Sequence, residues 1–310
     1  MKKALITGIS GFSGGYLAKH LLAQNISVYG IDIKPNLSAP HQGLKPKIRL
    51  NRVNLLNEKS VITVVKKVKP DYIFHLAALL RGDKLEDFIK INVLGTRNIL
   101  ESAMSVKARV LISGSSAEYG WVSKGDLPIT EETTPQPIDY YGITKLLQTM
   151  LGYQYFISQK VNTYLTRVFN MTGPGEPTRM VCGSLAQQIK DIKDGKARPI
   201  IYTGNLFPKR DFIDVRDVVR AYWSVVNKGK AGEIYNICSG KAYSIKEILS
   251  KLIKISRIGK VLIKPSYRKT RFVDIPIQVG DNTKIRKATG WQPQFGLTQT
   301  LTDMLRFYPE

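Results

Sequence analysis

A glycine-rich turn near the start of the chain is the feature that most narrows its possible folds. It reads Gly8-Ile9-Ser10-Gly11-Phe12-Ser13-Gly14, directly after an apolar strand at residues 4–7 and before a helical pattern at 16–22. Glycines let the backbone turn tightly, and the free N–H groups and dipole of the helix start favour a bound anion. Such a turn can also merely join strand to helix. In a strand-helix-strand setting, however, it predicts a dinucleotide pyrophosphate site with these contacts: Gly8, Gly11, Phe12, Ser13 and Gly14.

The rest of the first half repeats the alternation of strand and helix. Strands are expected at 26–31, 72–76, 109–112 and 163–168, with helices at 58–68, 88–104 and 140–158. This pattern is typical of a parallel sheet covered on both faces. We therefore predict an α/β fold, a Rossmann-type doubly wound parallel sheet with a smaller α/β substrate-binding lobe. Because the regularity ends near Gly173, we assign residues 1–170 to an NAD(P)-binding Rossmann domain, with parts of 205–240 returning to it. Residues 171–310 would mainly form the lobe.

The chain is strongly basic: 47 Lys and Arg against 24 Asp and Glu give a formal charge of +23. Because 43% of its 310 residues are hydrophobic, it can bury a full core, which excludes global disorder. The basic residues are scattered without a run of five, and neither an aromatic-rich RNA-binding segment nor a zinc-finger spacing accompanies them. We therefore expect a solvated basic surface that favours phosphate-bearing ligands, and no nucleic-acid partner.

Apolar runs and cysteines constrain location and metal binding. No apolar run approaches the roughly 20 residues of a membrane-spanning helix. The apolar stretch after Lys2 and Lys3 is too short for a signal peptide. We therefore expect a cytoplasmic protein without membrane insertion. Cys182 and Cys238 lack metal-ligand spacing, so buried free thiols and no metal site are expected.

Asp32 ends the second predicted strand. A carboxylate there can accept hydrogen bonds from the ribose hydroxyls of NAD and repels the 2′-phosphate of NADP. The position therefore favours NAD(H). A helix cap or a surface carboxylate is the alternative interpretation, and nearby Lys34 leaves NADP(H) possible.

Three further residues are candidates for acid-base catalysis. Tyr141 and Lys145 lie four residues apart near the start of a predicted helix, so they share a helical face. A free tyrosine, with a pKa of about 10, is a poor acid-base group at neutral pH, but a nearby ammonium stabilises its phenolate. Ser115 follows a predicted strand at the sheet edge where α/β proteins bind ligands. Such serines often cap helices, but beside the Tyr-Lys pair Ser115 is a candidate for holding a substrate oxygen.

These residues belong to a longer series of motifs that extends over nearly the whole chain. The series comprises Thr7-Gly8-x-x-Gly11-Phe12-x-Gly14, Asp32, His75-Leu76-Ala77-Ala78, Asn92-Val93-x-Gly95-Thr96, Ser115-Ser116-Ala117-Glu118-Tyr119-Gly120, Tyr141-x-x-x-Lys145, Arg167-x-Phe169-Asn170, Arg210-Asp211-Phe212-x-Asp214-Val215 and Gly290-Trp291-x-Pro293. It resembles the extended short-chain dehydrogenases/reductases that modify nucleotide-linked sugars.

The resemblance implies roles for these residues. Ser115, Tyr141 and Lys145 would be the catalytic trio, with Tyr141 and Lys145 also contacting the cofactor. Leu76, Ala77 and Ala78 would line the cofactor path, and Asn54 and Leu55 would lie by the adenine.

In the second half, the resemblance implies a sugar-nucleotide site. Arg210 and Arg271 would bind the pyrophosphate, for which the forked donors of arginine are suited. Asp274 would bind the ribose. For each of the two arginines, the alternative is a surface residue without a binding role. The remaining substrate contacts implied are Ser116, Asn170, Val181 and Ser184.

The nearest resemblance is to GDP-4-keto-6-deoxy-D-mannose reductases. It implies NAD(P)H-dependent reduction of a 4-keto group to give GDP-D-rhamnose, for polysaccharide biosynthesis. A GDP-mannose 4,6-dehydratase needs a further carboxylate two residues after the catalytic Ser, where this chain has Ala117, and Glu118 should face the other way. Asp32 equally suits an NAD-dependent NDP-hexose 4-epimerase. These two enzymes stay open, as does a non-enzymatic sugar-nucleotide or nucleic-acid binding protein.

A homodimer is also implied by the resemblance. Its interface would be the predicted helices at 88–104 and 140–158. Met150, Leu151 and Phe156 are candidates either for this interface or for the buried core.

Overall fold

A seven-stranded parallel sheet forms the centre of the structure, a computed structural model that describes residues 1–37, 39–266 and 275–307. Its strands are β1 (Lys3–Thr7), β2 (Ser27–Asp32), β3 (Ile48–Arg52), β4 (Tyr72–His75), β5 (Arg109–Ser115), β6 (Thr163–Val168) and β10 (Ile234–Ile237). They lie in the order β10-β6-β5-β4-β1-β2-β3, so the winding reverses between β1 and β4. This order confirms the predicted doubly wound sheet, although neither β3 nor β10 was among the strands expected from the sequence.

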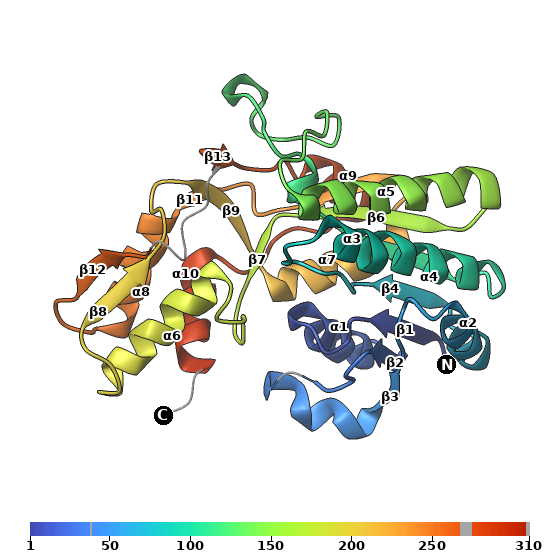
Figure 1. Cartoon of the computed structure of the whole chain (residues 1–310), viewed down its shortest axis with the longest axis horizontal. Coiled ribbons are helices and arrows are strands. Elements are labelled where there is room, and N and C mark those ends of the chain that lie inside the picture. The colour runs from blue at the N-terminus through green and yellow to red at the C-terminus, as the bar shows by residue number, and fades with distance from the viewer. Residues whose placement is uncertain (38, 267–274, 308–310) are drawn as a thin grey trace.

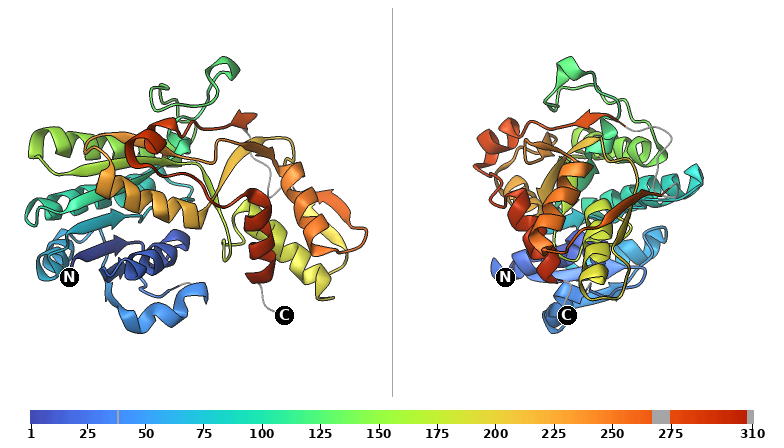
Figure 2. Two further views of the ribbon diagram at one scale, coloured as in Figure 1. Left: turned by 180° about the vertical axis from the view of Figure 1, so that it is seen from behind. Right: turned by 90° about the vertical axis from the view of Figure 1, so that its left-hand side faces the viewer.

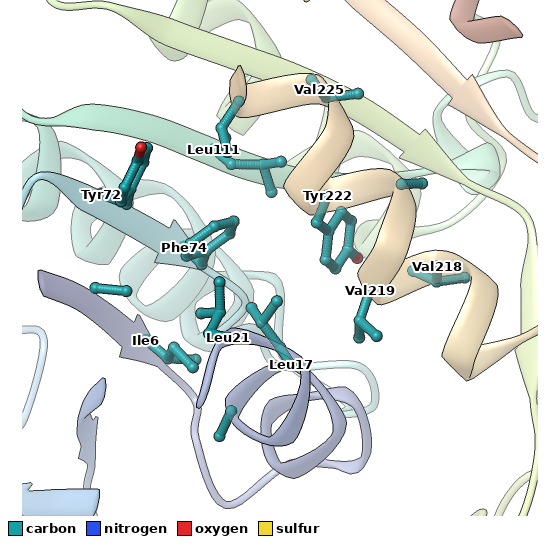
Figure 3. Close-up of a cluster of buried hydrophobic side chains, with 14 of the residues drawn as sticks. Ile6, Leu17, Leu21, Tyr72, Phe74, Leu111, Val218, Val219, Tyr222 and Val225 are labelled. Carbon is teal, nitrogen blue, oxygen red and sulfur yellow. The ribbon is translucent and has the colours of Figure 1, made fainter. Parts of the chain in front are cut away.

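Helices cover both faces of the sheet (Figure 1). On one face lie α1 (Phe12–Ala23) and α7 (Val215–Lys228), and on the other lie α2 (Glu58–Val68), α4 (Gly95–Met104) and α5 (Tyr140–Gln159). Figure 3 shows the first face, where Leu17 and Leu21 of α1 lie beside Ile6 and Phe74 of the strands, and Tyr222 projects from α7. Leu17 and Leu21 are one helical turn apart, so both reach the sheet.

The predicted helix at 88–104 is divided in the structure. It consists of α3 (Leu85–Phe88), a π-helical segment η2 (Ile89–Leu94) and α4. The side chain of Asn92 accepts a hydrogen bond from the N–H of Leu79 at 2.7 Å and donates one to its carbonyl at 3.1 Å. Asn92 thus ties the loop after β4 to the π-helical segment, a type of irregularity that is often functional.

The second lobe has its own core, formed by α6 (Val181–Lys193), α8 (Ile245–Ser256) and α10 (Leu297–Phe307). Two small sheets accompany these helices. One pairs β8 (Ile200–Thr203) with β12 (Leu262–Pro265), and the other joins β7 (Asn170–Thr172), β9 (Lys209–Asp214), β11 (Ala242–Ser244) and β13 (Ile277–Gln278). Because β6 runs on directly to β7, the lobe lies beyond the carboxyl edge of the parallel sheet (Figure 2).

The chain crosses repeatedly between the two parts. After β9 it returns to the parallel sheet through α7 and β10, and α9 (Thr283–Thr289) packs on both of these elements. Cys182 and Cys238 are buried and unpaired, as predicted. No helix in the described part of the chain has the length and apolar character that crossing a membrane requires.

Candidate active site

The glycine turn packs closely against the loop that follows β4. Gly8 has a φ of +67°, and a Cβ there would lie 2.8 Å from the Cα of Ala77. The N–H of Ala77 in turn donates to the Thr7 hydroxyl at 3.1 Å. Only glycine fits Gly8, because both its backbone conformation and its surroundings exclude a side chain. Residues 76–78 therefore run beside the glycine turn, at the point where the strand order reverses.

The N-terminus of α1 fits the pyrophosphate of a dinucleotide. Gly11 is its N-cap, with no capping side chain, and the first turn, which begins with Phe12 and Ser13, contains no acidic residue. No side chain of the N-cap or of the first helical turn therefore occupies or neutralises its N–H groups. A Cβ at Gly14 would lie 2.5 Å from the Ile9 carbonyl oxygen, so glycine is required for the turn to pack on the helix.

Asp32 lies at the carboxyl end of β2, beside this turn. Its carboxylate accepts hydrogen bonds from the N–H of Ser10 at 3.2 Å and the N–H of Lys34 at 3.4 Å. Two carboxylate oxygens have further acceptor capacity, so the half-buried group can still accept ribose hydroxyls. Lys34 itself is exposed next to it.

Asn54 and Leu55 follow β3, the neighbour of β2. The Asn54 side chain accepts from the N–H of Leu56 at 3.0 Å, and Asn98 on α4 donates to the Leu55 carbonyl at 2.8 Å. An open depression of about 490 Å³ is lined by Asn54, Leu56, Asn57, Glu58 and Lys59. Its position after β3, beside the end of β2, suits the adenosine end of a dinucleotide.

The three candidate catalytic residues meet at the carboxyl end of β5. Ser115 ends this strand, and its side chain lies near that of Tyr141, in the first turn of α5. Burial raises the pKa of Tyr141 to about 12, and the nearby Ser115 side chain opposes this rise. Lys145, only 3% exposed, donates to the Ser113 carbonyl. Burial lowers its pKa to about 8, against the attraction of Glu118.

A buried ion pair lies beneath Ser115. The N–H of Ser115 donates to Glu118 Oε1 at 2.9 Å, and Glu118 Oε2 accepts from Arg167 Nε at 2.8 Å and Thr149 Oγ1 at 3.0 Å. Burial raises the pKa of Glu118, and Arg167 opposes this rise. Glu118 is 0% exposed, and its bond to the Ser115 N–H ties it to the end of β5. Ala117 precedes it.

The second lobe contributes the candidate substrate residues. Asn170 begins β7, and Val181 and Ser184 share one side of the first turn of α6. Arg210 lies in β9, and its Nη1 donates to the Ile275 carbonyl at 2.6 Å. Arg271 and Asp274 lie outside the described residues.

Ser116 is turned toward the second lobe. It begins the short helix η3 (Ser116–Glu118) and is 4% exposed. Its hydroxyl donates to Gln278 Oε1 at 3.2 Å, and Gln278 Nε2 donates to the Ser116 carbonyl at 2.9 Å. Sequence reasoning assigned no role to Gln278. No spacing could have indicated one, because the two residues are 162 positions apart. Arg167 stood in a motif, but nothing in the sequence paired it with Glu118.

Comparisons with known proteins agree with this geometry. A family model described as GDP-mannose 4,6 dehydratase matches residues 5–304. The chain is 30% identical over 310 residues to a GDP-6-deoxy-D-mannose reductase from Pseudomonas aeruginosa, covering 98% of this chain and 96% of that protein. It is also 30% identical over 295 residues to a GDP-6-deoxy-D-talose 4-dehydrogenase from Aggregatibacter actinomycetemcomitans, covering 93% and 91%.

The fold is shared with a solved structure of similar length. The structure of RMD from Pseudomonas aeruginosa, complexed with NADPH, superposes with a TM-score of 0.85 at 28% identity. The match covers 99% of this chain and 98% of that one. The likeness therefore extends over both the parallel sheet and the second lobe.

Proposed function

The chain belongs to the GDP-mannose 4,6 dehydratase family of extended short-chain dehydrogenases/reductases, and we propose that it reduces the 4-keto group of GDP-4-keto-6-deoxy-D-mannose to give GDP-D-rhamnose. The relatives named above are nucleotide-sugar enzymes. The observation that carries this proposal is the convergence of Ser115, Tyr141 and Lys145 at the carboxyl end of β5, on the sheet edge that also bears the glycine turn.

Each residue of the trio has a distinct task. Tyr141 donates its phenolic proton to the C4 oxygen as that oxygen becomes a hydroxyl. Ser115 donates a hydrogen bond that orients the keto oxygen and the phenol together. The Lys145 ammonium stabilises the phenolate that Tyr141 leaves behind. A bound dihydronicotinamide supplies the hydride.

The position of Glu118 supports a reductase in preference to a dehydratase. Dehydration needs an acid-base group to take a proton from C5 and release the C6 hydroxyl. Ala117 occupies the position where the family's dehydratases would need that carboxylate, and the adjacent Glu118 is buried and paired with Arg167. A carboxylate held in this way is not available to a substrate.

In this proposal the two parts of the chain bind different ligands. We assign the cofactor to residues 1–170 together with α7 and β10, and the sugar nucleotide mainly to residues 171–310. In this assignment Arg210 contacts the pyrophosphate, and Asn170, Val181 and Ser184 contact the sugar or nucleotide. Arg271 and Asp274 stay proposed contacts on the family pattern alone.

The preferred cofactor in this proposal is NAD(H). Its support is the Asp32 carboxylate beside the glycine turn, which would repel a 2′-phosphate. The solved relative with NADPH shows that the fold also accommodates the phosphorylated cofactor, and Lys34 leaves that possible here.

One assay tests the reaction and the cofactor together. The protein is incubated with GDP-4-keto-6-deoxy-D-mannose and either NADH or NADPH, the absorbance of the reduced cofactor is followed, and the product is identified by NMR. We expect stoichiometric cofactor oxidation, with NADH giving the higher kcat/KM. Interconversion of an NDP-hexose with no cofactor consumed would instead indicate a 4-epimerase, and loss of water from GDP-mannose would indicate a dehydratase.

We also propose that two copies of the chain pair through α5. This helix has exposed apolar side chains on one face, at Ile143, Leu147, Met150 and Ile157, and Met150 and Ile157 are 58% and 50% exposed. The spacing is that of a helical stripe, and a contiguous exposed apolar stripe is typical of an interaction surface. Leu151, by contrast, packs into the core.

Charging this stripe should dissociate the dimer. In the double variant Leu147→Glu/Met150→Glu, two carboxylates would have to be desolvated in the interface, so we expect the mass of a single chain in light scattering after gel filtration. Leu262→Glu, at a leucine on β12 that is 54% exposed, is the control and should leave the mass of two chains. A wild-type protein that runs as a single chain would refute the proposed dimer.

A further inference from the structure

The contact between Ser116 and Gln278 joins the catalytic strand to the substrate lobe. Both residues are buried, at 4% and 5% exposure, and the amide of Gln278 makes two hydrogen bonds with Ser116, one to its hydroxyl and one to its carbonyl. Ser116 is the residue next to Ser115. A bidentate contact of this kind fixes both the distance and the orientation of the two segments.

The same short strand also holds Arg210. Gln278 of β13 is in register with Arg210 of β9, and the Arg210 guanidinium donates to the carbonyl of Ile275, just before β13. One continuous path therefore connects Arg210, through β13 and Gln278, to Ser116 and then Ser115.

On the other side, Ser115 has a rigid support. Its N–H is held by Glu118, and Glu118 is held by Arg167 and Thr149. Ser116 lies between Ser115 and this anchored carboxylate, and the Gln278 amide is its contact with the second lobe. Loss of that amide would remove the contact of η3 with the second lobe, while the contacts of Glu118 with Arg167 and Thr149 would stay.

We propose that Gln278 is a positioning residue that sets Ser115 relative to the nucleotide diphosphate held by Arg210. This inference rests on the proposed function, because it concerns the same keto-sugar site. Gln278 touches no reacting atom. It acts by holding Ser116, the neighbour of Ser115. When the phosphates of the nucleotide sugar bind the second lobe, the Ser115 hydroxyl is then at the right distance to contact the C4 oxygen.

The test compares Gln278→Leu with a control that loses the same kind of contact elsewhere. Gln188 on α6 also makes a bidentate amide pair, donating to the Tyr202 carbonyl at 3.1 Å and accepting from the Tyr202 N–H at 2.8 Å. Gln188→Leu therefore removes this pair of hydrogen bonds within the second lobe, together with a third from Gln188 Nε2 to the Ser184 carbonyl at 3.3 Å. We expect Gln278→Leu to lower kcat about 10-fold or more, since small misplacements of reacting groups are costly, and to leave the Kd for NADH unchanged. Gln188→Leu should retain the wild-type kcat.

A second measurement is independent of turnover. Hydrogen exchange of the peptide that contains residues 115–118 should be faster in Gln278→Leu than in the wild type, and unchanged in Gln188→Leu. If Gln278→Leu does not fold, Ser116→Ala replaces it, because that change removes only the hydroxyl half of the pair and should lower kcat in the same direction.

The outcomes separate this inference from the proposed function. Unchanged exchange at 115–118, or faster exchange with wild-type kcat, overturns the positioning role while the reductase stands. A wild type that oxidises no cofactor with the keto-sugar overturns the reductase, and the exchange measurement alone then decides whether Gln278 holds Ser116 and its neighbour.

Discussion

Replacement of Tyr141 by phenylalanine is expected to lower turnover of the keto-sugar about 10²- to 10⁴-fold, the usual contribution of a positioned acid-base group. In the proposed reaction the Tyr141 phenol is the proton source, and phenylalanine keeps the ring while removing that proton. The Kd for the nucleotide sugar should change little, because we propose that the nucleotide is bound mainly in the second lobe. Steady-state kinetics and calorimetric titration with GDP measure the two quantities.

Tyr140 is the matched control for this prediction. It is the preceding residue on α5, its ring packs against Phe88, and it is 46% exposed. Tyr140→Phe makes the same chemical change outside the proposed catalytic trio, so it should retain wild-type turnover. A Tyr141→Phe protein as active as Tyr140→Phe would show that another group supplies the proton.

Replacement of Arg167 by methionine is expected to destabilise the protein by about 3–5 kcal/mol, the usual cost of removing one partner from a buried ion pair. The change leaves the Glu118 carboxylate buried without its cation, while the methionine still fills the space of the aliphatic stem. Urea unfolding monitored by circular dichroism gives the difference in free energy of unfolding. Because Glu118 holds the Ser115 N–H, turnover should fall as well.

The free energy of unfolding that is lost in Arg167→Met should become larger as the pH rises. Burial raises the pKa of Glu118, and Arg167 opposes this rise, so without Arg167 the pKa rises further. The folded variant would then bind a proton that the unfolded chain releases, and its stability should fall as pH rises above the unfolded pKa of a glutamate. We expect a larger deficit at about pH 8 than at about pH 5.

An exposed ion pair provides the control. Arg97 and Glu58 are separated by 3.7 Å, and each side chain is about half exposed. Arg97→Met should change the free energy of unfolding by less than about 1 kcal/mol, because solvent screens such pairs. Equal losses in the two arginine variants would show that Glu118 does not depend on Arg167.

Local spacing was sufficient for much of the fold and part of the site. The glycine turn, the strands around it and the long helix that bears Tyr141 and Lys145 were all predicted where the structure has them. Each depends on residues within a few positions of one another. The expected helix at 88–104 is present, but its interior is the π-helical segment Ile89–Leu94, in which the side chain of Asn92 bonds to the backbone of Leu79, 13 residues earlier.

The sequence by itself determined the alternation of strands and helices in the first half of the chain apart from β3, the glycine turn, and the helical face shared by Tyr141 and Lys145, since all of these follow from backbone periodicity and short-range geometry. Only the tertiary structure decided that Glu118 is neutralised by Arg167, that Gln278 bonds to Ser116, and that β10 completes the sheet beside β6. The physical reason is that these contacts join residues far apart in the chain, and their formation depends on how whole elements pack and on the register of their strands.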